Sequence, residues 1–487
     1  MKFDRDVLYL ISKNLQNDSI SLYSFLLVSR IWCEVAVPVL WKIPGRIPLT
    51  EKAESILFNV ILSHFSEDSR DILKKQGIND LFTEAYRPLS FNYIIFWRHL
   101  DLQLLEDMIK SRNVAESNID IIINELLKLF INKNTKFLSL FIPYNFKYQL
   151  HNILWAEKCF SSLKFLHCDN RDKNIVEGLA IIAKSINKLI YHITYLYDIS
   201  GSLILIENQN NLNEIKIECR ASVQFEIIEI IEKSLIKKAN TIQHLQTNWD
   251  TEDKFLSYFV NLSSLEIGEY FWYKYARNKT NWCHLEKVSL PGLKVLIANI
   301  ESHQNLDRMI KITNGHLREI TLTHSGIVSD ADYNRRLIQA IYQNCPNLRY
   351  LNMPIKEQNI PEFERLLINC QNLNGLIFEY EMHFKYKSLF EILIRSSPIS
   401  LYKFKIYFNR KFGPKFKLLK SFFDNWKDRH PMILQINMVN FEDRQEMDKL
   451  KELVKKYEIK GIVQRCDFDC FYDYEDFDWI RKKTDVY

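Results

Sequence analysis

Histidines and cysteines stand next to each other at two points of this 487-residue sequence, and such pairs could ligate a metal or supply a nucleophile. The pairs are His167-Cys168 and Cys283-His284, and Cys466 and Cys470 lie four residues apart. No second pair lies at a spacing that would complete a four-ligand zinc set, so we expect no metal site.

Local signatures of catalysis are also missing from the sequence. It contains no glycine-rich phosphate loop, no Gly-x-Ser-x-Gly elbow and no His-Glu-x-x-His motif. We therefore expect no cofactor and no catalytic residue. A hydrolase or transferase whose catalytic groups converge from distant segments is the alternative that these absences leave open.

The composition is typical of a folded globular chain. Hydrophobic residues make up 47% and charged residues 26%, which excludes a disordered or collagen-like protein. The 65 basic and 60 acidic residues give a net charge of +5, too small for a dedicated nucleic-acid-binding protein. The nine cysteines are irregularly spaced, which predicts that they are reduced. The acidic start and the lack of an 18-residue apolar run predict a soluble protein of the cytoplasm and/or nucleus, with no membrane partner.

The strongest signal is a recurring triplet of apolar residues, with two residues between its first and second members and one between its second and third. Successive triplets begin 20 to 31 residues apart, with helical stretches such as 175–186 and 335–342 between them. This period predicts an α/β fold of stacked strand–turn–helix units, because one such unit cannot bury its own apolar face. The triplets are Leu163/Leu166/Cys168, Ile186/Leu189/Tyr191, Leu212/Ile215/Ile217, Ile242/Leu245/Thr247, Leu262/Leu265/Ile267, Leu293/Leu296/Ala298, Leu317/Ile320/Leu322, Leu348/Leu351/Met353, Leu373/Leu376/Phe378, Leu401/Phe404/Ile406 and Pro431/Leu434/Ile436.

Alternation along each strand predicts which side chains point away from the core. We expect these outward residues either to bind a protein or to be merely solvated. The stretch 403–420 carries seven basic residues among aromatic ones, but Phe404 and Ile406 belong to the repeat, so we expect no nucleic-acid site there. The predicted binding residues are Glu214, Lys216, Glu266, Glu319, Thr321, Tyr350, Asn352, Glu379, Lys403 and Lys405.

Three short helices are predicted in residues 1–45. The first begins after Asp4, the second contains Leu22 and Phe25, and the third closes before Pro38. A unit this small buries little apolar surface alone, so we expect a partner chain to cover part of it.

A connecting segment, 46–150, is predicted to hold helices over 51–65, 100–109 and 119–130, with turns at 66–69 and 87–88. The repeats occupy 151–440. Residues 441–487 are expected to form a cap and an acidic, aromatic tail.

Two resemblances emerge from these residues. The N-terminus resembles the F-box motif, with Phe3-Asp4 in place of its Leu-Pro opening and Ser29 in place of its Cys. The repeats resemble leucine-rich repeats of the cysteine-containing subtype, through 344–348 and 369–373. The F-box resemblance rests on Phe3-Asp4-Arg5-Asp6-Val7-Leu8, Ile11, Leu15, Ser21-Leu22, Leu27-Val28-Ser29-Arg30-Ile31-Trp32 and Leu40-Trp41.

This arrangement is similar to the F-box/leucine-rich-repeat substrate receptors of SCF ubiquitin ligases. The resemblance implies a horseshoe solenoid whose concave face holds a protein substrate, and an F-box that binds the SCF adaptor and, through it, cullin. The alternative is a non-catalytic repeat scaffold with a degenerate F-box, which the Phe3-Asp4 opening favours. The implied adaptor-binding residues are Phe3, Val7, Leu8, Ile11, Leu15, Leu26, Val28 and Trp32.

Overall fold

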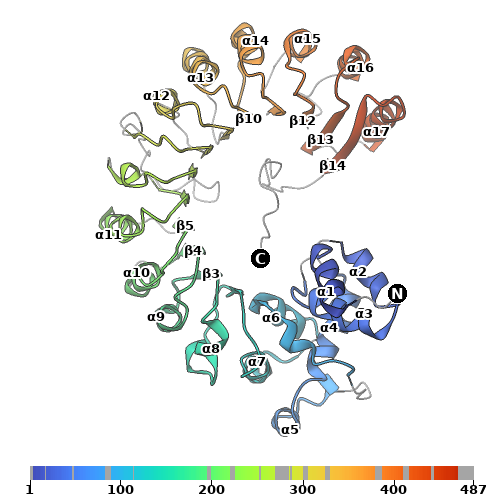
Figure 1. Cartoon of the computed structure of the whole chain (residues 1–487), viewed down its shortest axis with the longest axis vertical. Helices are drawn as coiled ribbons and strands as arrows, with labels where there is room; N and C mark the ends of the chain where they lie inside the picture. Colours follow the sequence, from blue (N-terminus) through green and yellow to red (C-terminus); the bar gives the residue numbers. More distant parts are fainter. Residues whose placement is uncertain are drawn as a thin grey trace. The chain divides into compact units, whose positions relative to one another are not determined.

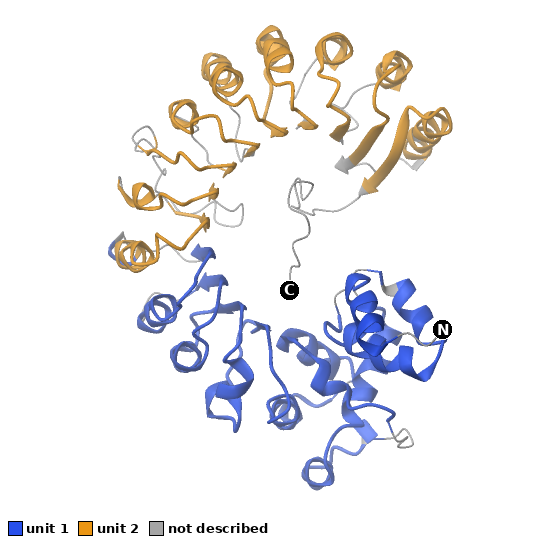
Figure 2. Ribbon diagram, viewed as in Figure 1, with its two compact units in different colours: residues 1–227, 485–487 blue, residues 228–484 orange. Residues whose placement is uncertain are grey.

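The computed structural model describes the chain apart from 1–3, 17, 46–48, 83–88, 113, 195–198, 220–224, 250, 252–253, 269–284, 286–287, 300–304, 324–329, 379–385, 410–415, 440–443 and 470–487. It divides into two compact units, which meet in sequence after Ile227 (Figure 2). Among the described residues, no helix combines the length and apolarity needed to cross a bilayer.

The three predicted N-terminal helices are confirmed as α1 (Arg5–Asn14), α2 (Ser19–Phe25) and α3 (Arg30–Leu40) (Figure 1). Each begins at a residue whose side chain accepts a backbone N–H of the first turn. These caps are Asp4, Asp18 and Ser29. Both α1 and α2 pack against α3.

Pro38 does not end the third helix, contrary to expectation. The helix runs on to Leu40, and the N–H of Trp41 still donates to the carbonyl of Val37 at 2.9 Å. Proline removes one N–H donor from the last turn of the helix. The free-energy cost of that lost hydrogen bond is small compared with the stabilisation from burying Val35–Val37 in the continued helix.

The rest of unit 1 alternates helices and strands more than the sequence predicted. Ser66, predicted to lie in a turn, instead caps helix α5. The helix predicted to start at Leu100 starts at Leu102, because residues 99–101 form strand β1. The elements are α4 (Glu51–Leu62), α5 (Glu67–Lys75), η1 (Asp80–Phe82), η2 (Tyr93–Phe96), β1 (His99–Asp101), α6 (Leu102–Lys110), α7 (Glu116–Phe130), β2 (Ser139–Phe141), η3 (Leu150–Asn152), α8 (Ala156–Phe160), β3 (Phe165–Asp169), α9 (Lys173–Ile182), β4 (Lys188–Ile193), α10 (Ser200–Glu207) and β5 (Glu214–Cys219).

Unit 2 continues with the same alternation, after a helix that spans the boundary between the units. Its elements are α11 (Phe225–Ile236), β6 (His244–Thr247), η4 (Phe255–Tyr258), β7 (Ser264–Gly268), β8 (Val295–Asn299), α12 (Leu306–Lys311), β9 (Glu319–Thr323), α13 (Ala331–Asn344), β10 (Tyr350–Asn352), η7 (Glu357–Asn359), α14 (Ile360–Asn369), β11 (Gly375–Phe378), α15 (Tyr386–Ser396), β12 (Lys403–Asn409), α16 (Phe416–Asn425), β13 (Met432–Val439), α17 (Arg444–Ile459) and β14 (Val463–Asp469).

Within each unit every described strand pairs in parallel with the next strand of the chain, and helices cover one face of the strands (Figure 1). The middle residue of each predicted triplet lies on one of the strands β3 to β13, so the prediction of an α/β fold built from strand–helix units is confirmed. Equivalent apolar residues align from strand to strand. In unit 1 these are Leu166, Leu189 and Ile215, and in unit 2 Leu265, Leu296, Ile320, Leu351, Leu376, Phe404 and Leu434, all buried.

The cysteines that precede β10 and β11 act as small core residues, as predicted. Cys345 and Cys370 are fully buried at the C-caps of α13 and α14. Burial raises the pKa of both thiols, that of Cys370 to about 12. Both therefore stay protonated at neutral pH, which argues for packing rather than redox chemistry.

Candidate protein-interaction sites

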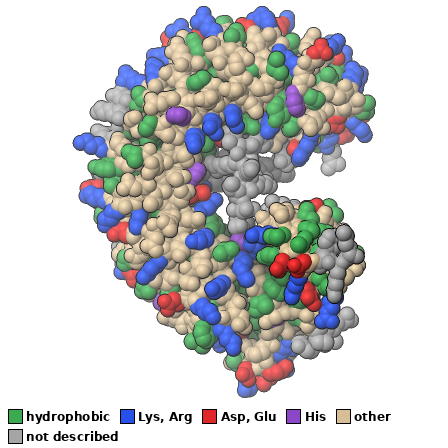
Figure 3. All heavy atoms as spheres, viewed as in Figure 1, with side chains coloured by type: hydrophobic (Ala, Val, Ile, Leu, Met, Phe, Trp, Pro, Cys, Tyr) green, Lys and Arg blue, Asp and Glu red, His purple; other side chains and the backbone are tan. Residues whose placement is uncertain are grey.

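The N-terminal helices expose an unusual amount of apolar side chain. Leu27 is 89% exposed, Ile20 79% and Val28 60%, and Val7 and Leu10 are also exposed. Figure 3 shows apolar side chains gathered on these helices beside acidic and basic ones. We call Val7, Leu10, Ile20, Leu27 and Val28 the N-terminal apolar surface. Exposure of so many aliphatic groups on so small a unit is typical of a protein-binding surface.

The predicted adaptor-binding residues divide into three groups. Val7 and Val28 are exposed, whereas Ile11, Leu15, Leu26 and Trp32 are half-buried. Leu8 is only 2% exposed and belongs to the core of the three helices, so its placement on the surface is wrong. Phe3 lies outside the described residues.

Contacts between the helices fix this surface. The ring of Trp32 packs on that of Phe25, with centroids 4.3 Å apart, and the Cys33 thiol donates to the carbonyl of Leu26 at 3.1 Å. Glu34 on α3 lies 3.7 Å from Arg5 on α1. The prediction of adaptor-binding residues did not include Leu10, Ile20 or Leu27, although helical spacing places Leu10 one turn from Val7.

A polar ladder crosses β3, β4 and β5 on the face opposite the helices. His167 Nε2 lies 2.8 Å from His192 Nε2, and His192 Nδ1 lies 3.0 Å from Glu218 Oε2. Lys216 Nζ contacts the other oxygen of Glu218 at 2.8 Å, and Lys188 Nζ lies 3.2 Å from Glu214. The two residues predicted here, Glu214 and Lys216, do share this face, on which they lie with His167, Lys188, His192 and Glu218.

Charge partners set the protonation of Glu218. Burial alone would raise the pKa of Glu218, but its contacts with His192 and Lys216 outweigh burial and lower that pKa to about 2. Glu218 is therefore a carboxylate throughout the physiological pH range. A row of fixed charges and imidazoles of this kind can recognise polar groups of a bound chain.

The adjacent pair His167-Cys168 is not a metal site. Neighbouring residues of a strand point to opposite faces, so His167 joins the ladder while Cys168 is buried in the core. Across the described part of the chain, no group of three or more His, Cys, Asp or Glu side chains is placed to hold a metal ion.

In unit 2 the predicted strand residues occupy the expected face, but several are buried rather than exposed. Those with less than a tenth of their surface exposed are Glu319, Thr321, Tyr350, Asn352 and Lys405. Parallel strands lie only about 4.8 Å apart, so side chains at the same register cover one another. Their exposure was therefore predicted wrongly.

The remaining predicted residues of unit 2 are partly accessible. Glu266 is half-buried and accepts a hydrogen bond from Gln246 at 2.7 Å. Lys403 is also half-buried, with its ammonium 3.3 Å from Tyr350 Oη and burial lowering its pKa. Glu379 lies outside the described residues.

The basic and aromatic stretch after β11 is mostly structural. Phe404, Lys405 and Ile406 are buried, and Lys420 pairs with Asp424 at 3.8 Å. This agrees with the expectation of a core and a solvated face; residues 410–415 lie outside the described part.

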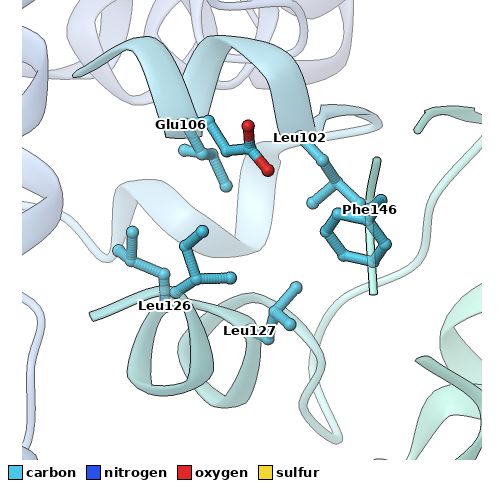
Figure 4. Close-up of a pocket in the computed structure, with 7 residues that line it drawn as sticks. Leu102, Glu106, Leu126, Leu127 and Phe146 are labelled. Carbon is cyan, nitrogen blue, oxygen red and sulfur yellow. The ribbon is translucent and has the colours of Figure 1, made fainter. Parts of the chain in front are cut away.

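A small hollow lies between α6 and α7 (Figure 4). Leu102 and Glu106 reach it from α6, Leu126 and Leu127 from α7, and Phe146 closes one side. Its lining is apolar apart from Glu106, which lies 3.4 Å from Lys110.

No family model and no curated protein matches this sequence. The fold and the sites by themselves define a chain of parallel strand–helix units with an exposed apolar surface at its N-terminus.

Proposed function

We propose that this chain is the substrate-recognition subunit of an SCF-type ubiquitin ligase, acting in the cytoplasm and/or nucleus without catalytic residues of its own. Its N-terminal helices would be an F-box that binds the adaptor, and its strand–helix units would be leucine-rich repeats that bind a target protein. One observation carries the proposal: the exposed N-terminal apolar surface includes Val7, Leu27 and Val28, which lie within the residues that resemble the F-box motif.

The mechanism is proximity. The adaptor links the receptor to cullin and hence to a charged ubiquitin-conjugating enzyme, while the strand face holds the target. Tethering raises the effective concentration of the target's lysines near the reactive thioester, so no acid, base or nucleophile is required of the receptor.

The binding energy would come from the apolar surface. Covering one aliphatic side chain contributes about 1.5–3 kcal/mol. Leu27 and Val28 are adjacent and exposed, so they are the residues on which an adaptor would act most strongly.

Co-expression with a tagged SCF adaptor tests the proposal. Wild-type chain should co-purify at near-equimolar level, and Leu27→Asp should lower affinity about 10- to 100-fold, the equivalent of one lost aliphatic contact. Leu154→Asp is the matched control, because Leu154 is 76% exposed in the same unit but outside the three helices. Co-purification that Leu27→Asp and Leu154→Asp leave equally intact would contradict the assigned surface.

The second candidate is a repeat scaffold that acts by association alone. Asp4 favours this second candidate. Asp4 stands where the F-box motif has proline, and it is an exposed acidic residue that caps α1. An acid at the edge of an apolar surface opposes docking of another apolar surface. If the adaptor fails to bind even the wild-type chain, while the chain still captures proteins through its repeats, this second function replaces the first.

A further inference from the structure

Three consecutive strands of unit 2 are each preceded by an exposed cation at the same register position. Lys294 precedes β8, Arg318 precedes β9 and Arg349 precedes β10, and all three side chains are exposed. We call them the rim cations.

The backbone places the rim cations next to one another. The N–H of Arg318 donates to the carbonyl of Lys294 at 2.7 Å, and the N–H of Arg349 donates to that of Arg318 at 2.8 Å. Parallel strands are about 4.8 Å apart, so the three positions form a row about 10 Å long on a rigid sheet edge. A flexible loop would not hold three like charges in such a row.

Carboxylates do not neutralise this row. In the described part of the chain none of the three cations forms an ion pair with an acidic residue, and the neighbouring rim positions are uncharged. Moving outward from the row, these neighbours are Ser263 and Gln243 on one side and Asn374 and Tyr402 on the other. The residues that lie three positions before β9, β10 and β11 are His316, Asn347 and Asn372, which are exposed and carry no carboxylate.

Three like charges in a row repel one another, and among the described residues no carboxylate forms an ion pair with them to offset that repulsion. A bound anion would offset it. The row is too short to follow a duplex, and no aromatic side chain stands at these three positions to stack on bases. Tyr402, the nearest rim aromatic, is already stacked on His430, with centroids 4.3 Å apart.

We propose that Lys294, Arg318 and Arg349 form a binding site for an acidic, extended segment of a partner protein. Acidic residues at alternate positions of an extended peptide are about 6.7 Å apart, close enough for two or three carboxylates to reach the long, flexible rim side chains. The site lies on strands of unit 2 and makes no use of the N-terminal apolar surface, so it stands whether or not the chain binds an SCF adaptor.

Fluorescence anisotropy with labelled peptides tests the site on the full chain. The probe carries three aspartates at alternate positions between glycines, and its control carries asparagines instead. We expect saturable binding of the aspartate peptide only, weakened at least about tenfold by Lys294→Glu/Arg318→Glu/Arg349→Glu and by a rise in salt from about 50 to 500 mM.

The matched control variant is Lys164→Glu. Lys164 occupies the same rim position before β3 in unit 1 and is exposed, but residues 138 and 187, its rim neighbours, are Leu and Asn. It should leave peptide binding unchanged.

Three results would overturn the proposal. The first is equal binding of the peptide to wild type and the triple variant, and the second is no saturable binding to wild type at low salt. The third is binding of a ten-nucleotide thymidine oligomer in place of the peptide, which would assign the row to nucleic acid. A triple variant that is less stable in urea but binds the peptide with wild-type affinity would also overturn the proposal, because the three cations would then contribute to stability and not to binding.

Discussion

Gln209 offers a quantitative test of how neighbouring repeats are joined in unit 1. The side chain is fully buried after α10, where its Oε1 accepts the N–H of Ile186 at 3.0 Å. Its Nε2 donates to the carbonyls of Ala183 and Leu205, both at 2.9 Å. One amide therefore ties the end of α10 to the residues that lead from α9 into β4.

Replacement by leucine keeps the volume and removes all three hydrogen bonds. Each bond contributes about 1 kcal/mol, and the N–H of Ile186 is left buried without this partner, so Gln209→Leu should cost about 3 kcal/mol. Gln209→Glu keeps the acceptor but loses both donors and buries a charge, so it should cost at least as much.

Urea unfolding of unit 1, with hydrogen exchange followed in peptides covering 183–209, measures this cost. Gln103→Leu is the matched control, because Gln103 bonds only to the neighbouring Asp107 in an exposed setting, and it should cost less than about 0.5 kcal/mol. If Gln209→Leu is as stable as Gln103→Leu, the amide does not join the repeats and the reasoning fails.

Three further outcomes are expected. Ser66→Ala should destabilise α5 by about 1 kcal/mol in thermal unfolding while Ser66→Asp does not, because Ser66 Oγ accepts the N–H of Ser69 at 3.1 Å; equal loss in both variants would contradict the cap. Burial lowers the pKa of His64, whose Nε2 accepts the N–H of Tyr93 at 3.0 Å. The stabilisation from neutral His64 is therefore present above pH about 6.5 and should be lost as the pH falls towards the lower pKa of the folded state. In urea unfolding at pH 7.5 and 5.5, His64→Gln should reduce this loss of stability, and an unchanged loss would contradict the role of His64. A thiol reagent followed by mass spectrometry should label the partly exposed Cys33 well before the buried Cys370, and equal rates in the native protein would refute the burial.

The sequence located the repeats well because each strand buries its own apolar triplet. From Leu166 on β3 to Leu434 on β13, the position of every aligned residue follows from spacing alone. Strands β1 and β2 were missed although the buried sets Trp97/Leu100/Leu102 and Phe137/Leu140/Ile142 have the same spacing as the triplets. Strand β14 was also missed, although Val463, Cys466 and Phe468 have the triplet spacing and Cys466 and Phe468 align with Leu434 and Ile436 of β13.

The candidate sites were harder to predict, since they depend on contacts between strands that are far apart in the sequence. His167 and His192 meet because β3 and β4 align in register, and 25 residues separate them. Whether Asn352 is buried depends on the side chains of neighbouring strands, which alternation along one strand does not reveal. The rim cations likewise became a row only when hydrogen bonds fixed the three strands side by side.

Calorimetric titration of the purified full chain with the purified SCF adaptor tests the central proposal most directly. We expect one adaptor per chain, a dissociation constant of about 1 µM or tighter, and loss of most of that affinity in a Leu27→Asp/Val28→Asp variant that unfolds at the wild-type temperature. The absence of saturable binding by the wild-type chain, or binding that this variant retains in full, would contradict the proposal that these helices recruit the ligase.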